Sequence, residues 1–316
     1  MYKRQSTDTA VAGLIGTHQG RGLSTYASEL LDSVSSFDVY REPDGINVHG
    51  WTSTAGLIGY APAMGLIDNC HATGDVTGYF SVGGFLGYQN PLVVRDSTAS
   101  GQVTGVYGVG GFAGATAGGG GLTATLINLS ASGDVTGDTH VGGFIGLLFW
   151  TTDVENSSAS GDVHAEVQNA GGFIGYIHTG LNLVRDNLSS GNVSSAGNNA
   201  GGFVGLVNNE YDHTAALQNN LTVSPSVSAE TNRHGFAGTI IDDTLSYGNF
   251  FYSYEDGLVD LHATGLDTAD LTNPLSYNGW DFETTWTIPV SDGGALVSAP
   301  HPVLIEMCDG EAIVCD

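Results

Sequence analysis

Three aspartates, Asp75, Asp134 and Asp162, are the residues of this chain whose type and spacing could support chemistry. Each follows a glycine and precedes a valine, and Gln102 and Asn192 stand in the same local context. If these segments are equivalent strands of a stacked array, the five side chains form one outward column with about 5 Å between neighbours. A calcium ion between coils could bridge two such carboxylates, and a retaining glycosidase uses a carboxylate pair at this spacing.

Hydrated surface acids are the alternative interpretation of this column. Two carboxylates about 5 Å apart repel by roughly 0.8 kcal/mol in bulk water, against about 3 kcal/mol at an effective dielectric constant of 20. The ten histidines are scattered without metal-ligand spacing, and the motifs G-x-S-x-G, GxxxxGK[ST] and H-E-x-x-H do not occur. We therefore expect no catalytic residue, and calcium is the one cofactor that the acids allow.

A repeated glycine-rich block must position these acids. Its eight copies, five of them reading G-G-F-x-G, begin at Ala12, Ala55, Gly83, Gly110, Gly142, Gly171, Gly201 and His234. After a first step of 43 residues, successive copies begin 27 to 33 residues apart. A period of about 30 residues over so many copies indicates a stacked array, in which each unit buries its apolar face against its neighbours.

Three short stretches of alternating character make up each unit: the glycine block, a segment ending in Asn or Asp, and a block such as Ala131-Ser132-Gly133-Asp134-Val135. This pattern predicts an all-β fold, a parallel β-solenoid (β-helix) with about 30 residues and three short strands per coil. The phenylalanines of the glycine blocks would stack as a buried core ladder, each worth roughly 1.5 to 3 kcal/mol. The ladder comprises Phe85, Phe112, Phe144, Phe173, Phe203 and Phe236.

Polar residues form further columns in this arrangement. Asparagines suit a corner of the coil, and the predicted corner column is Asn69, Asn128, Asn156, Asn187 and Asn220. Small hydroxyl residues form two outward columns, Thr73, Ser100, Ser132, Ser160 and Ser190, and Thr77, Thr104, Thr136, His164 and Ser194. A flat hydroxyl face is what an ice-binding solenoid would need, although ordinary β-surface composition also explains it.

The repeats divide the chain into three parts. Residues 1–11 form a leader, non-native or truncated, residues 12–252 form the solenoid, and residues 253–316 form a C-terminal cap and tail. Trp280, Phe282 and Trp286 are expected to cover the end of the phenylalanine ladder, with sugar binding as the alternative. Cys308 and Cys315 are predicted to form a disulfide that clips the tail, which favours an extracellular setting.

Composition restricts the partners of this chain. The net charge is -26, with Lys3 as the only lysine beside six arginines. Nucleic acid is excluded as a partner, because phosphate binding needs clustered basic residues. Strong acidity fits a marine or halophilic setting. No apolar run approaches the roughly 18 to 20 residues of a membrane span.

The repeated G-[LF]-[IVLA]-G block, followed by N-x-x-A-S-G-D-V, resembles the GLUG-motif repeats of bacterial surface proteins. These include adhesins and the non-catalytic parts of IgA1-protease-like peptidases. The closing run from Tyr277 to Phe282 is similar to the segment that often follows such repeats. The resemblance covers residues 12 to 305 and implies a surface-displayed β-solenoid, without transferring an activity.

These observations favour an extracellular, non-enzymatic structural or adhesive module at the cell surface, part of a longer polypeptide, that displays polar faces or loops to a glycan or protein ligand. An ice-binding or glycan-binding solenoid is the alternative. A polysaccharide-degrading enzyme on a β-helix scaffold is the third hypothesis. It would need acids converging in loops near Asp44, or near Asp153 and Glu155.

Overall fold

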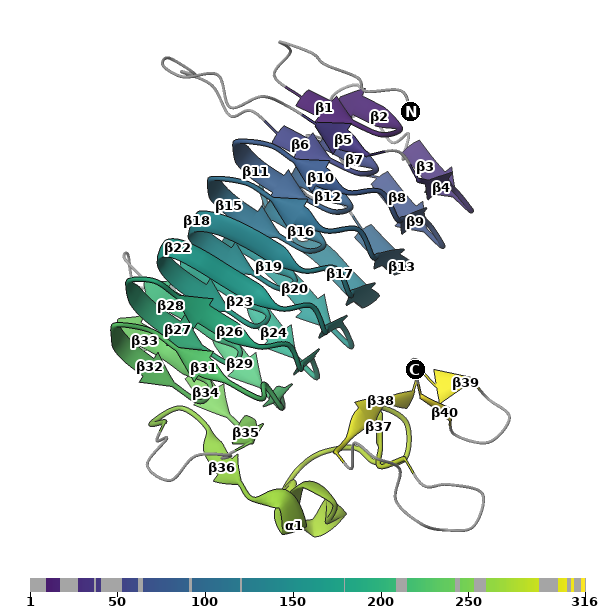
Figure 1. Ribbon diagram of the computed structural model, residues 1–316. Coiled ribbons are helices and arrows are strands. Elements are labelled where there is room, and N and C mark those ends of the chain that lie inside the picture. Colours follow the sequence, from purple (N-terminus) through teal and green to yellow (C-terminus); the bar gives the residue numbers. More distant parts are fainter. Residues whose placement is uncertain are drawn as a thin grey trace.

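The computed structural model shows an almost entirely β protein whose strands stack in parallel coils along one axis (Figure 1). It describes residues 10–17, 28–36, 38–40, 53–61, 65–90, 93–119, 121–178, 180–208, 215–241, 245–252, 260–289, 301–305, 308–309 and 314–315. The predicted parallel β-solenoid is therefore confirmed.

Sheet B has eight strands, one from each coil, and its order follows the sequence. Its strands are β2 (Ile15–Thr17), β7 (Ile58–Ala61), β12 (Leu86–Gln89), β16 (Ala113–Ala117), β19 (Ile145–Phe149), β23 (Ile174–His178), β28 (Val204–Asn208) and β33 (Ala237–Ile241). Two residues separate each of these strands from the preceding strand of a second sheet, sheet A, so that the glycine blocks form the corner between sheets A and B.

Sheet A has thirteen strands. They are β1 (Ala10–Ala12), β5 (Val39–Tyr40), β6 (Ser53–Ala55), β10 (Val76–Thr77), β11 (Phe80–Gly83), β14 (Val103–Thr104), β15 (Tyr107–Gly110), β18 (Val135–Gly142), β22 (Val163–Gly171), β26 (Val193–Ser195), β27 (Asn198–Gly201), β31 (Val227–Ser228) and β32 (Thr231–His234).

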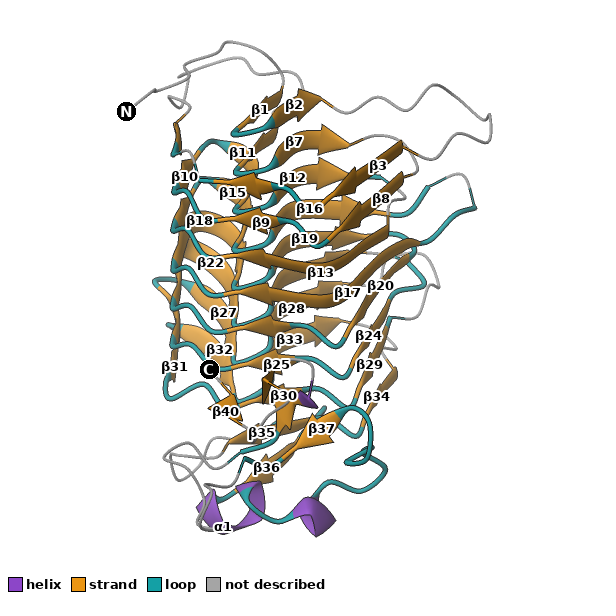
Figure 2. Ribbon diagram, turned by 90° about the vertical axis from the view of Figure 1, so that its right-hand side faces the viewer, coloured by secondary structure: helices purple, strands orange, loops and turns teal. Residues whose placement is uncertain are grey.

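Sheet C has fifteen strands and completes the coil (Figure 2). They are β3 (Ser28–Leu31), β4 (Val34–Ser35), β8 (Gly65–Asp68), β9 (His71–Ala72), β13 (Val93–Ala99), β17 (Ala124–Ala131), β20 (Thr152–Glu155), β21 (Ser158–Ala159), β24 (Leu183–Arg185), β25 (Leu188–Ser189), β29 (Ala216–Gln218), β30 (Leu221–Thr222), β34 (Leu245–Tyr247), β35 (Phe250–Tyr252) and β36 (Thr264–Leu266).

Sheets A and C both bend, so a typical coil contains five short strand segments in three sheets instead of three single strands. The bend in sheet C lies at residues with positive φ, a conformation that Asn, Asp and Gly tolerate best. These residues are Asp32, Asn69, Asp96, Asn128, Asn156, Asp186, Asn219 and Gly248.

The predicted position at the corner was wrong for Asn187 and Asn220, which lie one position beyond the bend. Both are fully buried, and their side chains form a ladder with Asn249. The Oδ1 atom of Asn220 accepts the backbone N–H of Asn187 at 3.2 Å, and that of Asn249 accepts the backbone N–H of Asn220 at 2.9 Å. Two adjacent Asx residues occupy this stretch, and only the three-dimensional register distinguishes them.

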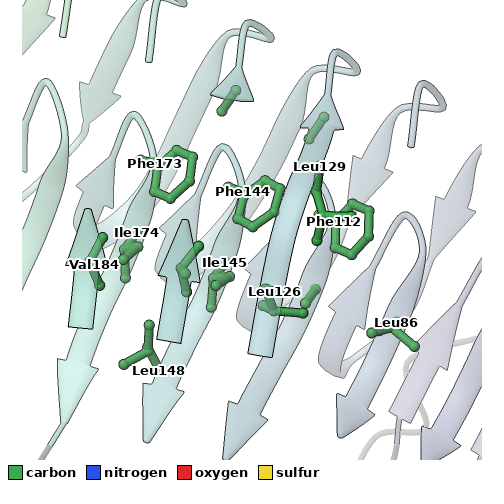
Figure 3. Close-up of a cluster of buried hydrophobic side chains, with 14 of the residues drawn as sticks. Leu86, Phe112, Leu126, Leu129, Phe144, Ile145, Leu148, Phe173, Ile174 and Val184 are labelled. Carbon is green, nitrogen blue, oxygen red and sulfur yellow. The ribbon is translucent and has the colours of Figure 1, made fainter. Parts of the chain in front are cut away.

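The main core lies between sheets B and C and contains the phenylalanines of the glycine blocks (Figure 3). All six have no exposed surface, and neighbouring rings stack with centroids 4.5 to 5.0 Å apart along the series Phe85, Phe112, Phe144, Phe173, Phe203 and Phe236. The carbonyl oxygen of each accepts two backbone N–H groups of the preceding coil, as Phe173 does from Phe144 and Ile145. Ring stacking and hydrogen bonding therefore repeat together along this column.

The last coil is closed by a side chain. Asp260 Oδ2 accepts the backbone N–H groups of Phe236 and Ala237 at 2.9 and 2.8 Å. In every earlier coil from Phe85 onward, a phenylalanine carbonyl oxygen makes these two bonds. The Phe251 ring covers Gly235, where an added Cβ would lie 2.1 Å from the ring. Asp260 and Phe251 thus take the place of a further coil.

The prediction that Trp280, Phe282 and Trp286 cover the end of the ladder was wrong. They belong to a separate cluster with Leu188, Leu221 and Phe250, on the side of sheet C opposite the main core. Trp280 Nε1 donates to the carbonyl oxygen of Gly248 at 2.8 Å. On this outer side of sheet C, the last coils carry large apolar residues where earlier coils carry small polar ones; Leu188, for example, pairs with Ser158 of the preceding coil. The aromatic segment therefore packs against the last coils.

Around these aromatic residues, the C-terminal segment contains a short helix α1 (Thr268–Leu271), a 3-10 turn (Pro274–Ser276) and the antiparallel pair β37 (Trp286–Thr287) and β38 (Val303–Leu304). A second antiparallel pair, β39 (Cys308–Asp309) and β40 (Val314–Cys315), sets Cys308 opposite Cys315 along the backbone. Directly opposed residues have the Cα separation that disulfides require. The disulfide stays a prediction.

Candidate functional site

The acid column predicted from the sequence lies in the turns between sheets C and A, one residue before the strands of sheet A. The valines that follow these acids pair from coil to coil, Val135 with Val163 for example, which aligns Asp134 with Asp162. Asp75, Asp134 and Asp162 are all exposed.

Their carboxylates accept hydrogen bonds from the backbone of the next coil. Asp75 Oδ1 accepts the N–H of Gln102 at 2.9 Å, and Asp134 Oδ1 accepts the N–H of Asp162 at 2.9 Å. Asp162 Oδ1 accepts the N–H of Asn192 at 2.8 Å. A carboxylate that accepts a backbone N–H satisfies a donor at a turn, so these acids support the coil without a metal.

No group of three or more His, Cys, Asp or Glu side chains in the described ranges is close enough to hold a metal ion. The column by itself therefore offers few ligands, since calcium takes six to eight oxygen ligands. Calcium between coils stays a proposal that needs water or another molecule to complete the ligand set.

The second hydroxyl column lies on sheet A, and the first follows directly after the strands of sheet C. Thr77, Thr104 and Thr136 pair in register, followed by His164 and Ser194. Within this second column, His164 Nδ1 lies 2.7 Å from Ser194 Oγ. The outer faces are therefore regular, but their hydroxyl groups are partly used in contacts between coils.

Asp153 and Glu155, which the enzyme hypothesis required to converge in loops, lie on strand β20. Glu155 Oε2 pairs with Arg185 of the next coil at 2.5 Å. Burial and the neighbouring Glu155 raise the pKa of Asp153. Burial also raises the pKa of Asp186, whose Oδ1 lies 3.5 Å from the indole nitrogen of the buried Trp286. These acids line the outer side of sheet C, and Asp44 lies outside the described residues.

The corner between sheets B and C is where the coils differ from one another, and loops follow this corner at the right-hand edge of Figure 2. Six residues, 118–123, join the paired positions Ala117 and Ala124, whereas two residues, 150–151, join their partners Phe149 and Thr152. The next two coils differ again, with 178–182 between Ile177 and Leu183 but 208–215 between Val207 and Ala216.

Every corner between sheets A and B, by contrast, has two residues. Gly142 and Ile145 are the flanking positions in one coil, and their partners are Gly171 and Ile174 in the next. The uneven repeat spacing of the sequence thus comes mainly from the B–C corner. That spacing was the available signal for a variable site, and the sequence reasoning did not use it.

Trp150 is the most prominent residue that this reasoning missed. It lies in the shortest described B–C turn, is 58% exposed, and has a positive φ of 57°. Leu181 of the next coil is 61% exposed, and Leu122 of the preceding coil is 40% exposed. We call these three residues the Trp150 ridge.

The chain shares a sequence motif with a known protein family. The GLUG motif model matches residues 52–77 and 137–163, so the predicted GLUG repeats are confirmed. Among solved structures, a Bacteroides ovatus protein provisionally described as an immunoglobulin A1 protease aligns with a TM-score of 0.48 and 14% identity, over 89% of this chain and 87% of that chain. No curated protein gives a significant sequence match.

In the part of the chain that the structure describes, no helix combines the length and apolar character needed to cross a membrane.

Proposed function

Because the chain is a β-solenoid that carries GLUG repeats, we propose that it is an extracellular, non-enzymatic adhesive module of a cell-surface protein. The stacked coils act as a stiff rod, and the B–C corner displays ligand-binding loops along one edge. Several weak contacts on one rigid support would give multivalent attachment.

The observation that carries this proposal is that turn length is constant at one corner of the coil and variable at the other. The A–B corner keeps two residues in all eight coils, while the B–C corner ranges from the turn at 150–151 to the six residues 118–123. Loops on a rigid scaffold tolerate insertion and often carry binding functions. Of these two corners only the B–C corner varies in length, which supports a binding role there.

Charge and cysteine content support the location and the class of partner. A chain with 33 acidic and seven basic residues is a poor ligand for nucleic acid. The opposition of Cys308 and Cys315 in the backbone supports an oxidising environment. We expect a glycan or protein ligand outside the cell.

Attachment of the protein to coated surfaces tests this function. Beads carrying the chain would be washed over plates coated with mucin, hydroxyethyl cellulose or serum albumin, and the retained fraction counted. A matched variant lacks 119–122, which shortens the six-residue turn 118–123 to two residues, as in the next coil. We expect retention on at least one coating other than albumin, and weaker retention of the variant at an unchanged melting temperature.

Two results would count against the adhesive role. The first is no retention of wild-type beads above the level of albumin-coated beads on any coating. The second is equal retention of the wild type and the shortened variant, which would move the binding surface away from the B–C corner. Repeating the assay with calcium and with a chelator tests the metal proposal separately, because a calcium bridge between coils would also raise the melting temperature.

A further inference from the structure

Trp150 combines two features that folding alone does not favour. A bulky residue at a φ of 57° is an outlier, because the left-handed region crowds its Cβ against the backbone. Its side chain is also 58% exposed, while the other described tryptophans, Trp280 and Trp286, are buried. Strained positions held by their surroundings are concentrated at functional sites.

Both neighbouring coils hold the Trp150 turn in place. A Cβ added at Gly180 would lie 2.2 Å from the carbonyl oxygen of Trp150, and one added at Gly118 would lie 2.1 Å from that of Thr151. On the next residue, the backbone N–H of Thr152 donates to Oδ1 of the buried Asn182 at 3.0 Å. The exposed indole therefore stands on a backbone with little freedom to move.

An aromatic cluster supports the same turn. The ring of Phe149, next to Trp150, lies 5.4 Å from that of His178, and His178 lies 5.6 Å from Tyr176. Tyr176 stacks on His140 at 4.5 Å. Rigid aromatic anchors bind at low cost in conformational entropy, because few torsions must be fixed on binding.

The small size of the Trp150 ridge limits the class of ligand that it can bind. A stable protein interface takes about 800 Å² and 20 to 30 residues on each side, whereas the Trp150 ridge has three exposed apolar side chains on adjacent coils. Half-buried polar residues, Thr125 and Asp153, begin sheet C beside it. One aromatic face with a few polar groups fits a small ring that is apolar on its face and polar at its edge.

Charge restricts the occupant further. With a net charge of -26, the chain repels anionic polymers and anionic lipid surfaces. A neutral carbohydrate is compatible with this field, and the flat face of a pyranose ring matches an exposed indole. The turns that carry Leu122 and Leu181 adjoin the Trp150 turn. Gly118 lies against the carbonyl oxygen of Thr151, and Gly180, next to Leu181, lies against that of Trp150.

We propose that the Trp150 ridge binds a neutral glycan, with one pyranose ring stacked on Trp150 between Leu122 and Leu181, and with Thr125 and Asp153 within reach of its hydroxyl groups. This inference rests on the adhesive function proposed above and names its ligand class and contact residue.

Affinity electrophoresis tests the proposal. The full chain would migrate through native gels that contain hydroxyethyl cellulose, laminarin or galactomannan, with anionic alginate as the charge control. We expect retardation by at least one neutral polysaccharide and not by alginate. Trp150→Ala should weaken that retardation about tenfold or more, whereas Leu275→Ala, which removes an exposed leucine far from the corner, should not.

A stability measurement separates binding from folding. Asparagine tolerates a positive φ, so Trp150→Asn should melt at the same or a higher temperature than the wild type while losing glycan binding. A lower melting temperature would make Trp150 a structural residue and overturn the proposal. Wild-type retardation by Trp150→Ala, retardation by alginate alone, or no retardation by any neutral polysaccharide would also overturn it.

Two other ligands of the Trp150 ridge, a lipid surface and a second copy of this chain, would give different results. Sedimentation with phosphatidylcholine vesicles that Trp150→Ala abolishes would indicate a lipid surface, and Trp150-dependent dimers in analytical ultracentrifugation would indicate a second copy of this chain. Either result replaces the glycan. If beads of the Trp150→Ala variant are retained like wild type while the shortened-loop variant is not, the adhesive function stands and this inference fails.

Discussion

The A–B and B–C corners turn the same chain in the same coils, yet only one of them varies. At the A–B corner, a Cβ added at Gly142 would lie 2.0 Å from the carbonyl oxygen of Ile145, and one added at Gly146 would lie 2.4 Å from the backbone nitrogen of Val109. In this coil neither position leaves room for a side chain. The B–C corner accommodates two residues at 150–151 and six at 118–123.

The difference shows how the fold separates stability from recognition. The A–B corner carries the buried phenylalanine and the hydrogen bonds between successive coils, so a change there disturbs both neighbouring coils. Changes in a turn that faces solvent cost little, because loop-closure entropy grows slowly with length. Four predictions test this contrast.

The largest effect is expected at the phenylalanine ladder. Phe144→Ala should lower the free energy of unfolding by about 3 to 5 kcal/mol, because it leaves a hole between Phe112 and Phe173. Leu122→Ala at the B–C corner is the matched control and should change it by less than about 0.5 kcal/mol. Denaturant unfolding measures both, and similar values for the two variants would remove the contrast between the corners.

A pH effect of nearly this size should come from His140, which is 7% exposed and packs against Tyr107 and Tyr176. Burial, together with the nearby His178, lowers its pKa from 6.5 to about 4. Between these values the unfolded chain binds a proton that the folded chain does not, so stability falls as the pH decreases. About 3 kcal/mol present at pH 7 should be lost by pH 4.

His140→Asn isolates this contribution. Asparagine occupies the equivalent left-handed position in the next coils, at Asn169 and Asn199, where Asn199 Nδ2 donates to Asn169 Oδ1 at 2.6 Å. The variant should fold and lose most of the stability change between pH 6.5 and 4, as measured by unfolding at each pH. An unchanged pH profile would assign the effect to other groups.

The closure of the last coil should have a moderate effect. Asp260→Ala removes the acceptor for the backbone N–H groups of Phe236 and Ala237, and unpaired buried donors cost about 1 to 3 kcal/mol. Amide hydrogen exchange should accelerate at Phe236 and Ala237 more than at Phe173. Asp260→Asn keeps an oxygen acceptor and should lose less; equal losses in both variants would argue against this role of the carboxylate.

The smallest effect on stability is expected at the B–C corner. Deleting 119–122 leaves two residues in the turn, as in the next coil, and should change the free energy of unfolding by no more than about 1 kcal/mol. Circular dichroism and thermal melting would measure this. A loss as large as that of Phe144→Ala would mean that the turn is part of the fold and not a replaceable loop.

The sequence alone was sufficient to place a residue in the fold wherever the same residue type recurred at the same position of successive repeats. The phenylalanines recur with identical glycine neighbours, and the structure stacks them in one buried column. It was insufficient at Asn187 and Asn220, because Asp186 and Asn219 immediately before them are equally suited to a left-handed bend. Which of two adjacent residues lies at the bend depends on backbone pairing with the next coil.

The C-terminal aromatics and Trp150 had no repeating pattern to place them. Trp286 packs beside Asp186, one hundred residues away in the chain, and no local signal links the two. Trp150 reads as one aromatic residue among many until the structure gives its exposure and its backbone conformation.

The amino-acid sequence thus determined the parallel solenoid, its period and its phenylalanine core, because a repeat buries its apolar face only by stacking in register on its own copies. Tertiary structure alone decided which side of sheet C receives the C-terminal aromatics, that Asp260 closes the last coil, and that Trp150 stands exposed at the variable corner. Each of these depends on which surfaces remain unpaired after the coils have stacked, and that cannot be read from local spacing.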